Sequence, residues 1–245
     1  MGAFVRILAS VKTALEMRTL VNSEPQVEAS VAAPTLIEPS AAQIQVPIAR
    51  VTHRAELLSS FARELEAIGG VFAGSVSPGE LPTRSVAIAD QLGALIIAVG
   101  EGVTHDLLPI ANLLEQHHRD LILFGAAGDD EARRAALARI ARADLGIVEA
   151  HCAIAASGTV AVVASPARPN ALTLMPPAVL VIVPADRIFP DLASAIEQLG
   201  PDLIAGRRTV FITGPSRTAD IEKRIVIGVH GPRNLHVLAL WPTDV

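Results

Sequence analysis

The residues best suited to chemistry lie together near the C-terminal end, in the segment 213–241. An alternating run at 209–213 predicts a strand, so Gly214 predicts the turn that ends it and Thr218 the cap of a following helix. Free backbone N–H groups at a helix start, with a guanidinium beside them, favour a carboxylate or phosphate. The segment therefore predicts an anion site formed by Gly214, Ser216, Arg217, Thr218 and, in the next turn, Gly231. In the alternative, the hydroxyls only cap the helix and the arginine pairs with a nearby acid.

Three side chains of the same segment are candidate catalytic groups for proton transfer. Asp220 and Glu222 fall in the first turn of the predicted helix, and His230 stands just before a glycine turn. Histidine, with an ordinary pKa of about 6.5, suits a general base. The alternatives are structural, because the helix dipole favours acids at that position and His230 could hold its turn or contact a ligand.

Glu149, His151 and Cys152 form a second polar group between two predicted strands. Adjacent strand residues face opposite sides, so the thiol would lack its base and a nucleophilic cysteine is not expected. Cys152 is the only cysteine, which excludes an internal disulfide and an iron–sulfur cluster held by this chain alone. The histidines show no metal-ligand spacing, so no metal site is predicted.

Composition argues against two classes of protein. A net charge of -5, dispersed basic residues and 3% aromatic residues disfavour nucleic-acid binding. The mean hydropathy is high, at +0.45, but the longest apolar stretches are too short to span a membrane. Arg6 and Lys12 interrupt any signal-peptide core, so we expect no membrane span and a cytoplasmic location.

The first 48 residues differ from the rest in composition and in the spacing of their apolar residues. Residues 3–19 carry apolar side chains at helical spacing, whereas 22–48 contain four prolines and no sustained period. We expect an N-terminal helix and proline-containing linker over 1–48, followed by one α/β domain over 49–245. The helix could dock on its own domain or bind a partner.

From residue 52 onward the pattern alternates between helix and strand. Helices are predicted over 53–69, 84–92, 104–118, 129–144 and 189–199, and strands over 70–75, 95–100, 121–125, 145–150, 152–155, 159–165, 179–185, 209–213 and 225–232. Ser157-Gly158 predicts a tight hairpin turn. Together these elements predict a three-layer, mixed and mainly parallel sheet with helices on both faces. Ligands bind outside the carboxyl ends of such strands, where we expect the loops to gather at 125–130, 156–158, 214–220 and 230–234.

Several motifs resemble the LUD-domain family, and within it the lactate utilization protein C (LutC/YkgG) group. They are GPSRTADIE (214–222), GVHGP, LHVLAL, ADLGIVEAHCAIAASGT (143–159), LMPPAVLVIVPADRIFPDL (174–192) and FVRILASVKTAL (4–15). The resemblance implies a fold similar to the NagB/RpiA/CoA-transferase-like class and a role in oxidising L-lactate to pyruvate. It also implies partner subunits that carry iron–sulfur clusters. With one cysteine and no dinucleotide-binding fingerprint, we expect no cofactor bound by this chain, and as a general base His230 could take the 2-hydroxyl proton of lactate.

The chain departs from the family pattern at one acid. Members usually read Ala-Glu-Thr-Gly-Thr where this chain has Ala155-Ala156-Ser157-Gly158-Thr159. If the missing carboxylate acted on substrate, another acid such as Glu149 or Asp220 would have to replace it. Gly158 and the hydroxyls of Ser157 and Thr159 remain, so these three residues are expected to contribute to the anion site.

Two functions follow from the sequence. The first is a component of an L-lactate utilization system that binds a small carboxylate or phosphate ligand beside iron–sulfur subunits. The alternative is a stand-alone binding protein or enzyme for a phosphorylated or CoA-linked small metabolite, by analogy with the fold alone.

Overall fold

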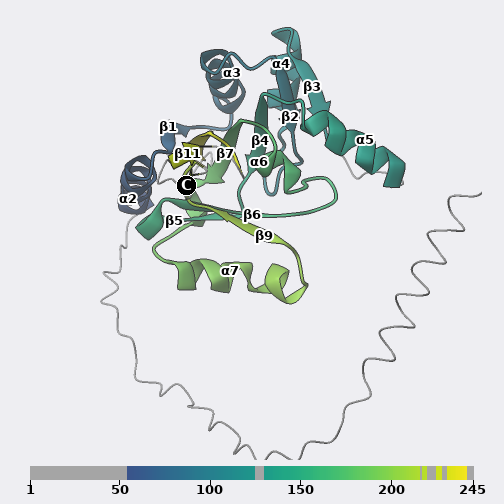
Figure 1. Cartoon of the computed structure of the whole chain (residues 1–245). Helices are drawn as coiled ribbons and strands as arrows, with labels where there is room; N and C mark the ends of the chain where they lie inside the picture. Colours follow the sequence, from purple (N-terminus) through teal and green to yellow (C-terminus); the bar gives the residue numbers. More distant parts are fainter. Residues whose placement is uncertain (1–53, 125–129, 216, 220–224, 228–230, 242–245) are drawn as a thin grey trace, which may run out of the picture. The chain divides into compact units, whose positions relative to one another are not determined.

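The computed structural model describes residues 54–124, 130–215, 217–219, 225–227 and 231–241 (Figure 1). All of them lie in the compact unit 49–245, and the expected N-terminal helix and linker lie outside the described residues. Helices are α2 (Arg54–Ala67), α3 (Leu81–Gln91), α4 (Leu108–Gln116), α5 (Asp130–Ile140), α6 (Ala171–Leu174) and α7 (Leu192–Ile204), with the 3-10 turns η1 (Ala155–Ser157) and η2 (Ala185–Arg187). Strands are β1 (Val71–Val76), β2 (Ile96–Val99), β3 (Asp120–Leu123), β4 (Leu145–Glu149), β5 (Cys152–Ile154), β6 (Thr159–Val163), β7 (Ala178–Pro184), β8 (Ile188–Phe189), β9 (Thr209–Ile212), β10 (Arg217–Ala219), β11 (Ile225–Ile227) and β12 (Asn234–Leu240).

Six strands form the main sheet, in the order β1-β12-β7-β4-β2-β3. Every neighbouring pair is parallel. The central strand β7 is buried at all of its residues and reads as a continuous apolar run, AVLVIVP. This is the pattern of a parallel strand covered on both faces, and it explains why the chain needs so few aromatic residues to build a core.

A second sheet has the order β8-β5-β6-β9. It begins where two strands of the main sheet end, because β5 follows β4 closely and β8 follows β7 through η2. The parallel pairing of β5 with β8 therefore continues that of β4 with β7. β6 then returns antiparallel to β5, as the predicted hairpin requires, and β9 adds antiparallel to β6.

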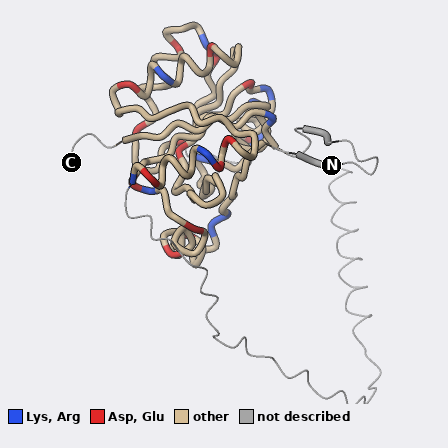
Figure 2. The backbone as a smooth tube through the Cα atoms, turned by 90° about the vertical axis from the view of Figure 1, so that its left-hand side faces the viewer, with Lys and Arg blue, Asp and Glu red and all other residues tan. Residues whose placement is uncertain are grey.

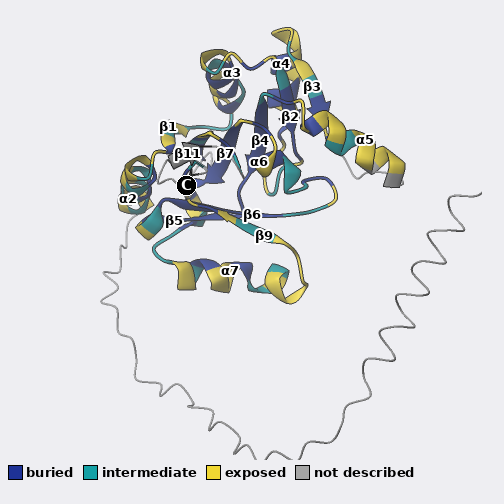
Figure 3. Ribbon diagram, viewed as in Figure 1, coloured by how far each residue is buried: buried dark blue, intermediate teal, exposed yellow. Residues whose placement is uncertain are grey.

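Alternation along the strands separates three apolar cores. Ile97, Leu145 and Leu180 face α3 and α4, whereas Val148 and Val181 face the other way, toward α2, α5, α6 and the second sheet. The far face of the second sheet packs against α7 through Ala195 and Leu199. The layers are thus α3 and α4, the main sheet, the second sheet with its flanking helices, and α7, whose outer side is exposed in Figure 3.

The predicted fold class is confirmed, since a parallel sheet carries helices on both faces, and the hairpin strands add a layer of their own. The helix start predicted at Thr218 is wrong. Residues Arg217–Ala219 form β10, which pairs antiparallel with β11 in a small separate sheet. The residue types at 216–222 are typical of a helix start, but pairing with β11 makes Arg217–Ala219 a strand.

Charge is distributed evenly over the described backbone, with acidic and basic residues interspersed in Figure 2. No basic face of the kind that tracks a phosphate backbone is visible in this view. Within the ranges that the structure describes, none of the helices combines the length and the apolar character needed to cross a bilayer.

Candidate functional site

The main sheet reverses its winding between β2 and β4. The chain leaving β2 leads to β3 on one side, whereas the chain leaving β4 leads to β7 on the other. Loops that depart in opposite directions leave a crevice at the carboxyl ends of the two strands, and this is where ligands bind in open α/β sheets. Gly100, Glu101 and Gly102 follow β2, and Glu149 closes β4, so these residues border the crevice.

Glu149 is fully buried and holds the loop that follows β2. Its Oε2 accepts the backbone N–H groups of Val103 at 2.6 Å, Thr104 at 3.1 Å and His105 at 3.1 Å. Its Oε1 accepts the Thr104 hydroxyl and lies 3.0 Å from His105 Nδ1. Burial alone would raise the pKa of Glu149, but the hydrogen bonds from Thr104, His105 and Val103 outweigh it, and the pKa lies below its ordinary value. The group is therefore a carboxylate at neutral pH.

Gly102 is required for this arrangement. A Cβ atom at Gly102 would stand 1.7 Å from the carbonyl oxygen of His105 and 3.0 Å from Glu149 Oε2. Only a residue without a side chain lets the loop close over the carboxylate. Gly102 thus lets the loop after β2 pack directly on Glu149.

His105 is the partly exposed end of this network. Its side chain is 28% exposed, while that of Glu149 is fully buried. Nδ1 lies 3.0 Å from Glu149 Oε1 and 2.8 Å from the Thr104 hydroxyl, so the network assigns the ring proton to Nδ1. Nε2 makes no hydrogen bond within the described part of the chain. A carboxylate that orients an imidazole in this way prepares it to accept a proton.

Arg168 braces the same loop from the other side. Its Nη1 donates to the carbonyls of Glu101 at 2.9 Å and Gly102 at 3.2 Å, and its Nε donates to Val163 O at 3.1 Å. His151 lies against it, with Nε2 at 3.3 Å from Arg168 Nη2 and Nδ1 accepting the Val163 N–H at 3.2 Å. Burial and the Arg168 charge lower the pKa of His151 to about 4, so this ring is neutral and structural.

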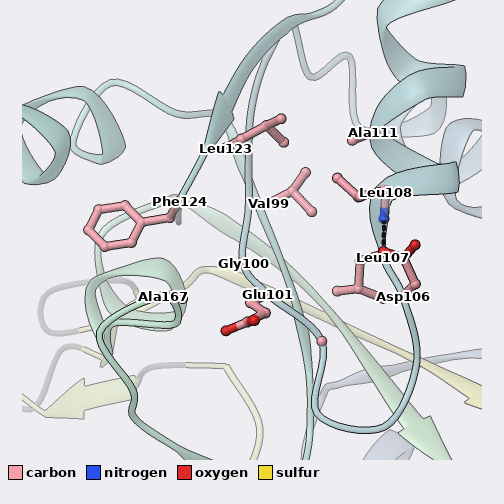
Figure 4. A pocket seen from close by; sticks show the side chains of 11 residues that line it. Val99, Gly100, Glu101, Asp106, Leu107, Leu108, Ala111, Leu123, Phe124 and Ala167 are labelled. Atoms are coloured by element: carbon pink, nitrogen blue, oxygen red, sulfur yellow. Dashed lines mark hydrogen bonds between the residues drawn. The ribbon is translucent and has the colours of Figure 1, made fainter. Parts of the chain in front are cut away.

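A cavity of about 310 Å³ opens beside the crevice, between the carboxyl ends of β2 and β3 and the start of α4. Its walls are apolar, and Glu101 and Asp106 supply the only charged side chains among the described residues that line it (Figure 4). Asp106 Oδ1 accepts the Leu108 N–H at 2.9 Å, which fixes the turn into α4. His105 precedes this lining directly in the chain, so the imidazole and the cavity share one loop.

The structure brings some of the sequence-predicted anion residues together, at another edge. The Thr159 hydroxyl lies 2.7 Å from that of Ser157 and 2.8 Å from that of Thr213, beside Gly214. Gly158 packs on the backbone of Leu65 in α2, and Gly214 faces the carbonyl of Ile68. These contacts lie at the C-terminal end of α2, just before β1 begins. That end of a helix carries partial negative charge, which opposes an anion.

The remaining predicted site residues do not reach the crevice or are not described. Gly231 precedes Arg233, whose N–H donates to Pro177 O at the start of β7, so it lies at the amino edge of the main sheet, opposite to the expected edge. Arg217 and Thr218 belong to β10, so the helix start proposed to hold an anion there is absent. Ser216, Asp220, Glu222 and His230 lie outside the described residues.

Cys152 matches the expectation of an unreactive thiol. It begins β5 and is fully buried beneath α7, and burial raises its pKa to about 11. A thiol held in this form is a poor nucleophile and a poor metal ligand. In the part of the chain that the structure describes, no group of three His, Cys, Asp or Glu side chains is placed to hold a metal ion.

The predictions from the sequence did not include Thr104, His105 or Arg168. Glu149 was predicted only as a member of the polar group 149–152 and as a substitute for the acid missing at position 156. A signal was available, because GEGVTHD directly follows a buried strand, where a polar run marks a loop at the carboxyl edge. The partner of that loop lies more than forty residues away in the sequence, at the end of β4. Pairing the two required the strand order, which the sequence does not reveal.

Comparison with known proteins gives a consistent family match. A family model described as the LUD domain matches residues 38–240. A solved structure of a DUF162 family protein from Deinococcus radiodurans is similar with a TM-score of 0.56 and 25% identity, over 77% of this chain and 98% of that one.

Curated relatives match over part of their length. Lactate utilization protein C of Oceanobacillus iheyensis is 36% identical over 98 residues, which cover 38% of this chain and 42% of the relative. The uncharacterized protein YkgG of Escherichia coli is 30% identical over 64% of this chain and 67% of its own length. An uncharacterized protein of Neisseria meningitidis serogroup B is 31% identical over 60% of this chain. The chain spans about two thirds of that relative's length, at 66%.

Proposed function

Because the chain belongs to the LUD-domain family, we propose that it takes part in lactate utilization as a proton-accepting component that works beside electron-carrying subunits. The observation that supports this most is the buried Glu149 carboxylate, which orients His105 at the crevice where the main sheet reverses its winding. Relatives that carry the name lactate utilization protein C supply the substrate class.

The chemistry divides naturally between two kinds of group. Conversion of L-lactate to pyruvate removes the proton of the 2-hydroxyl group and a hydrogen from C2 together with an electron pair. His105 Nε2 is free to take the hydroxyl proton, and Glu149 stabilises the imidazolium that forms. The C2 hydrogen is lost as a proton to solvent, and the electron pair passes one electron at a time to iron–sulfur clusters. We assign these clusters to partner subunits because the one cysteine of this chain is a buried thiol.

The cavity beside His105 does not favour the alternative ligand class. Glu101 and Asp106 stand at its lining, and their negative charge repels the double charge of a phosphate group more strongly than the single charge of lactate. A phosphorylated or CoA-linked metabolite would therefore need a different entrance. The apolar wall formed by Val99, Leu107 and Phe124 suits the uncharged part of a ligand or of a partner subunit.

The proposal is tested by replacing His105 with Gln in the complex purified with its partner subunits. Loss of a general base lowers turnover by about 10²–10⁴-fold, and binding of the partners should stay unchanged. The assay is lactate-dependent reduction followed by absorbance. His117→Gln is the matched control, because His117 is exposed at the end of α4 and donates no side-chain hydrogen bond in the described structure. Full turnover in the His105 variant would refute the assignment.

A second measurement tests the division of labour. The isolated chain is expected not to oxidise L-lactate when an artificial electron acceptor is added, whereas addition of the partner subunits should restore the reaction. Lactate oxidation by the isolated chain would show that it carries the redox step itself, and the partner subunits would then have no place in the proposal.

A further inference from the structure

A second cavity, of about 470 Å³, lies away from the His105 crevice. It is bordered by Leu137 of α5, by Arg208 just before β9, and by the turn 164–171 that connects β6 to α6. The turn is fixed by reciprocal backbone hydrogen bonds of 3.1 Å between Ser165 and Arg168, and Ala164 N–H donates to Arg208 O at 2.7 Å. The backbone that carries the lining side chains is therefore fixed.

Polar atoms without partners gather at this cavity. Four buried side-chain nitrogen or oxygen atoms lack a hydrogen-bond partner in the described residues, and three of them belong to Ser165, Asn170 and Thr209. Ser165 and Asn170 line the cavity, whereas Thr209 does not. A buried hydroxyl or amide without a partner costs about 1–3 kcal/mol, so two at one cavity indicate groups that a ligand completes.

The charge of the cavity is positive. Arg208 is its one charged side chain among the described lining residues, and its guanidinium makes no ion pair or hydrogen bond there. The adjacent Arg207 differs, because its Nη1 donates to Asp202 Oδ1 at 2.8 Å. A free guanidinium next to unpartnered hydroxyl and amide groups is suited to a carboxylate or phosphate.

We propose that this cavity binds a small hydroxylated anion. The anionic group pairs with Arg208 and accepts from the Ser165 hydroxyl, while a hydroxyl group of the ligand donates to Asn170 Oδ1, which is an acceptor only. The site is distinct from the His105 crevice, although the same turn carries Ala167 of the first cavity and Arg168. The proposal does not depend on lactate oxidation.

The test is calorimetric titration of the isolated chain with ligands that separate charge from hydroxylation. Glycerol 3-phosphate and D-glycerate carry both features, ethyl phosphate and propionate carry only the charge, and glycerol carries only hydroxyls. Saturable binding of at least one hydroxylated anion is expected, with its unhydroxylated counterpart weaker and glycerol silent. The phosphate and carboxylate pairs then tell which anion the site prefers.

Two variants link such binding to the cavity. Arg208→Gln should weaken binding at least about tenfold, since a charge-assisted contact is lost, and Arg207→Gln should leave it unchanged because that arginine is paired elsewhere. Asn170→Ala should lower the affinity for the hydroxylated anion to that of the anion without hydroxyl groups. The proposal is overturned if none of the anions binds saturably, if Arg208→Gln binds like wild type, or if the hydroxyl group makes no difference.

Discussion

At the scale of single residues, one buried carboxylate organises the crevice. Glu149 is surrounded by donors, three of them consecutive backbone N–H groups of the loop after β2. A buried charge is tolerated when hydrogen bonds replace its water, and here those bonds also shape the loop that carries His105. The same group therefore serves both stability and the proposed proton transfer.

Acidification is expected to lower the free energy of unfolding, first through His151. Its pKa is about 4 in the folded protein against 6.5 when unfolded, so the unfolded state binds the proton first and stability falls as the pH drops from 6.5 toward 4. The loss between pH 7 and pH 5 is about 2 kcal/mol. Glu149, with its lowered pKa, adds a further loss as the pH falls below the ordinary carboxyl range. Urea unfolding across this pH series measures the sum.

The contribution of His151 to the pH dependence of the free energy of unfolding can be isolated with variants. His151→Gln should flatten the dependence between pH 6.5 and pH 4, and His117→Gln should leave it as in wild type, because His117 is exposed. A free energy of unfolding that stays constant for wild type over this range would contradict the assignment of His151 as a buried neutral ring.

The sequence suggested Glu149 as a functional acid but not its role. Its chemistry follows from residue type, whereas its partners at 103–105 follow from the strand order. Likewise, Ser157 and Thr159 were expected at a ligand, and the structure shows the Thr159 hydroxyl bonded to those of Ser157 and Thr213. Residue type predicts what a side chain can do, and the tertiary contacts decide where it does so.

At the scale of elements, the turn between β5 and β6 is a close contact with α2. Gly158 has φ +59, and a Cβ atom there would lie 2.3 Å from Leu65 N and 2.6 Å from Leu65 Cα. The turn therefore packs against α2 with no room for a side chain at position 158. This contact, together with the positive φ, explains why the predicted hairpin turn has a glycine there.

Gly158→Ala is expected to destabilise the protein by more than the cost of its backbone conformation. Gly206→Ala is the matched control, because Gly206 has φ +69 with nothing within 4 Å of a Cβ atom. The control should lose about 1 kcal/mol, whereas the Gly158 variant should lose several, since backbone atoms of α2 must move. Thermal unfolding of both variants gives the comparison. Equal losses of stability would mean that α2 can move away from residue 158 at little cost.

Local sequence patterns predicted most helices and strands, but they failed for strands that depend on pairing with distant parts of the chain. The helix predicted over 189–199 is found as α7, which starts after Asp191, whose side chain accepts the Ser194 N–H at 2.9 Å. The segment after Gly214 carries similar signals, yet Arg217–Ala219 pairs with Ile225–Ile227. β12 was not assigned as a strand either, because its short mixed run NLHVLAL becomes a strand only between β1 and β7.

At the scale of the whole molecule, α7 covers the second sheet as a separate layer. Its inner residues Ala195 and Leu199 pack on Cys152 and its neighbours, while Leu203 is 38% exposed. The only cysteine of the chain therefore reports whether this layer is closed.

Cys152 is expected to resist alkylation by iodoacetamide in the folded protein, because it is buried and its pKa is raised to about 11. Leu199→Ala should speed labelling strongly, since removing a buried leucine costs about 2–5 kcal/mol and loosens α7. Leu203→Ala should change the rate little. Mass spectrometry against time gives the rates, and rapid labelling of wild type would show that α7 does not shield the thiol.

The position of β12 has a consequence for how the protein is made. β1 pairs in the main sheet with β12, which also pairs with β7. During translation β1 leaves the ribosome early and stays without its neighbour until residues 234–240 have followed. A nascent chain stopped before that point presents two unpaired strand edges, at β1 and at β7. Chaperone capture of such arrested chains should therefore persist until β12 emerges, and release should coincide with its insertion into the sheet.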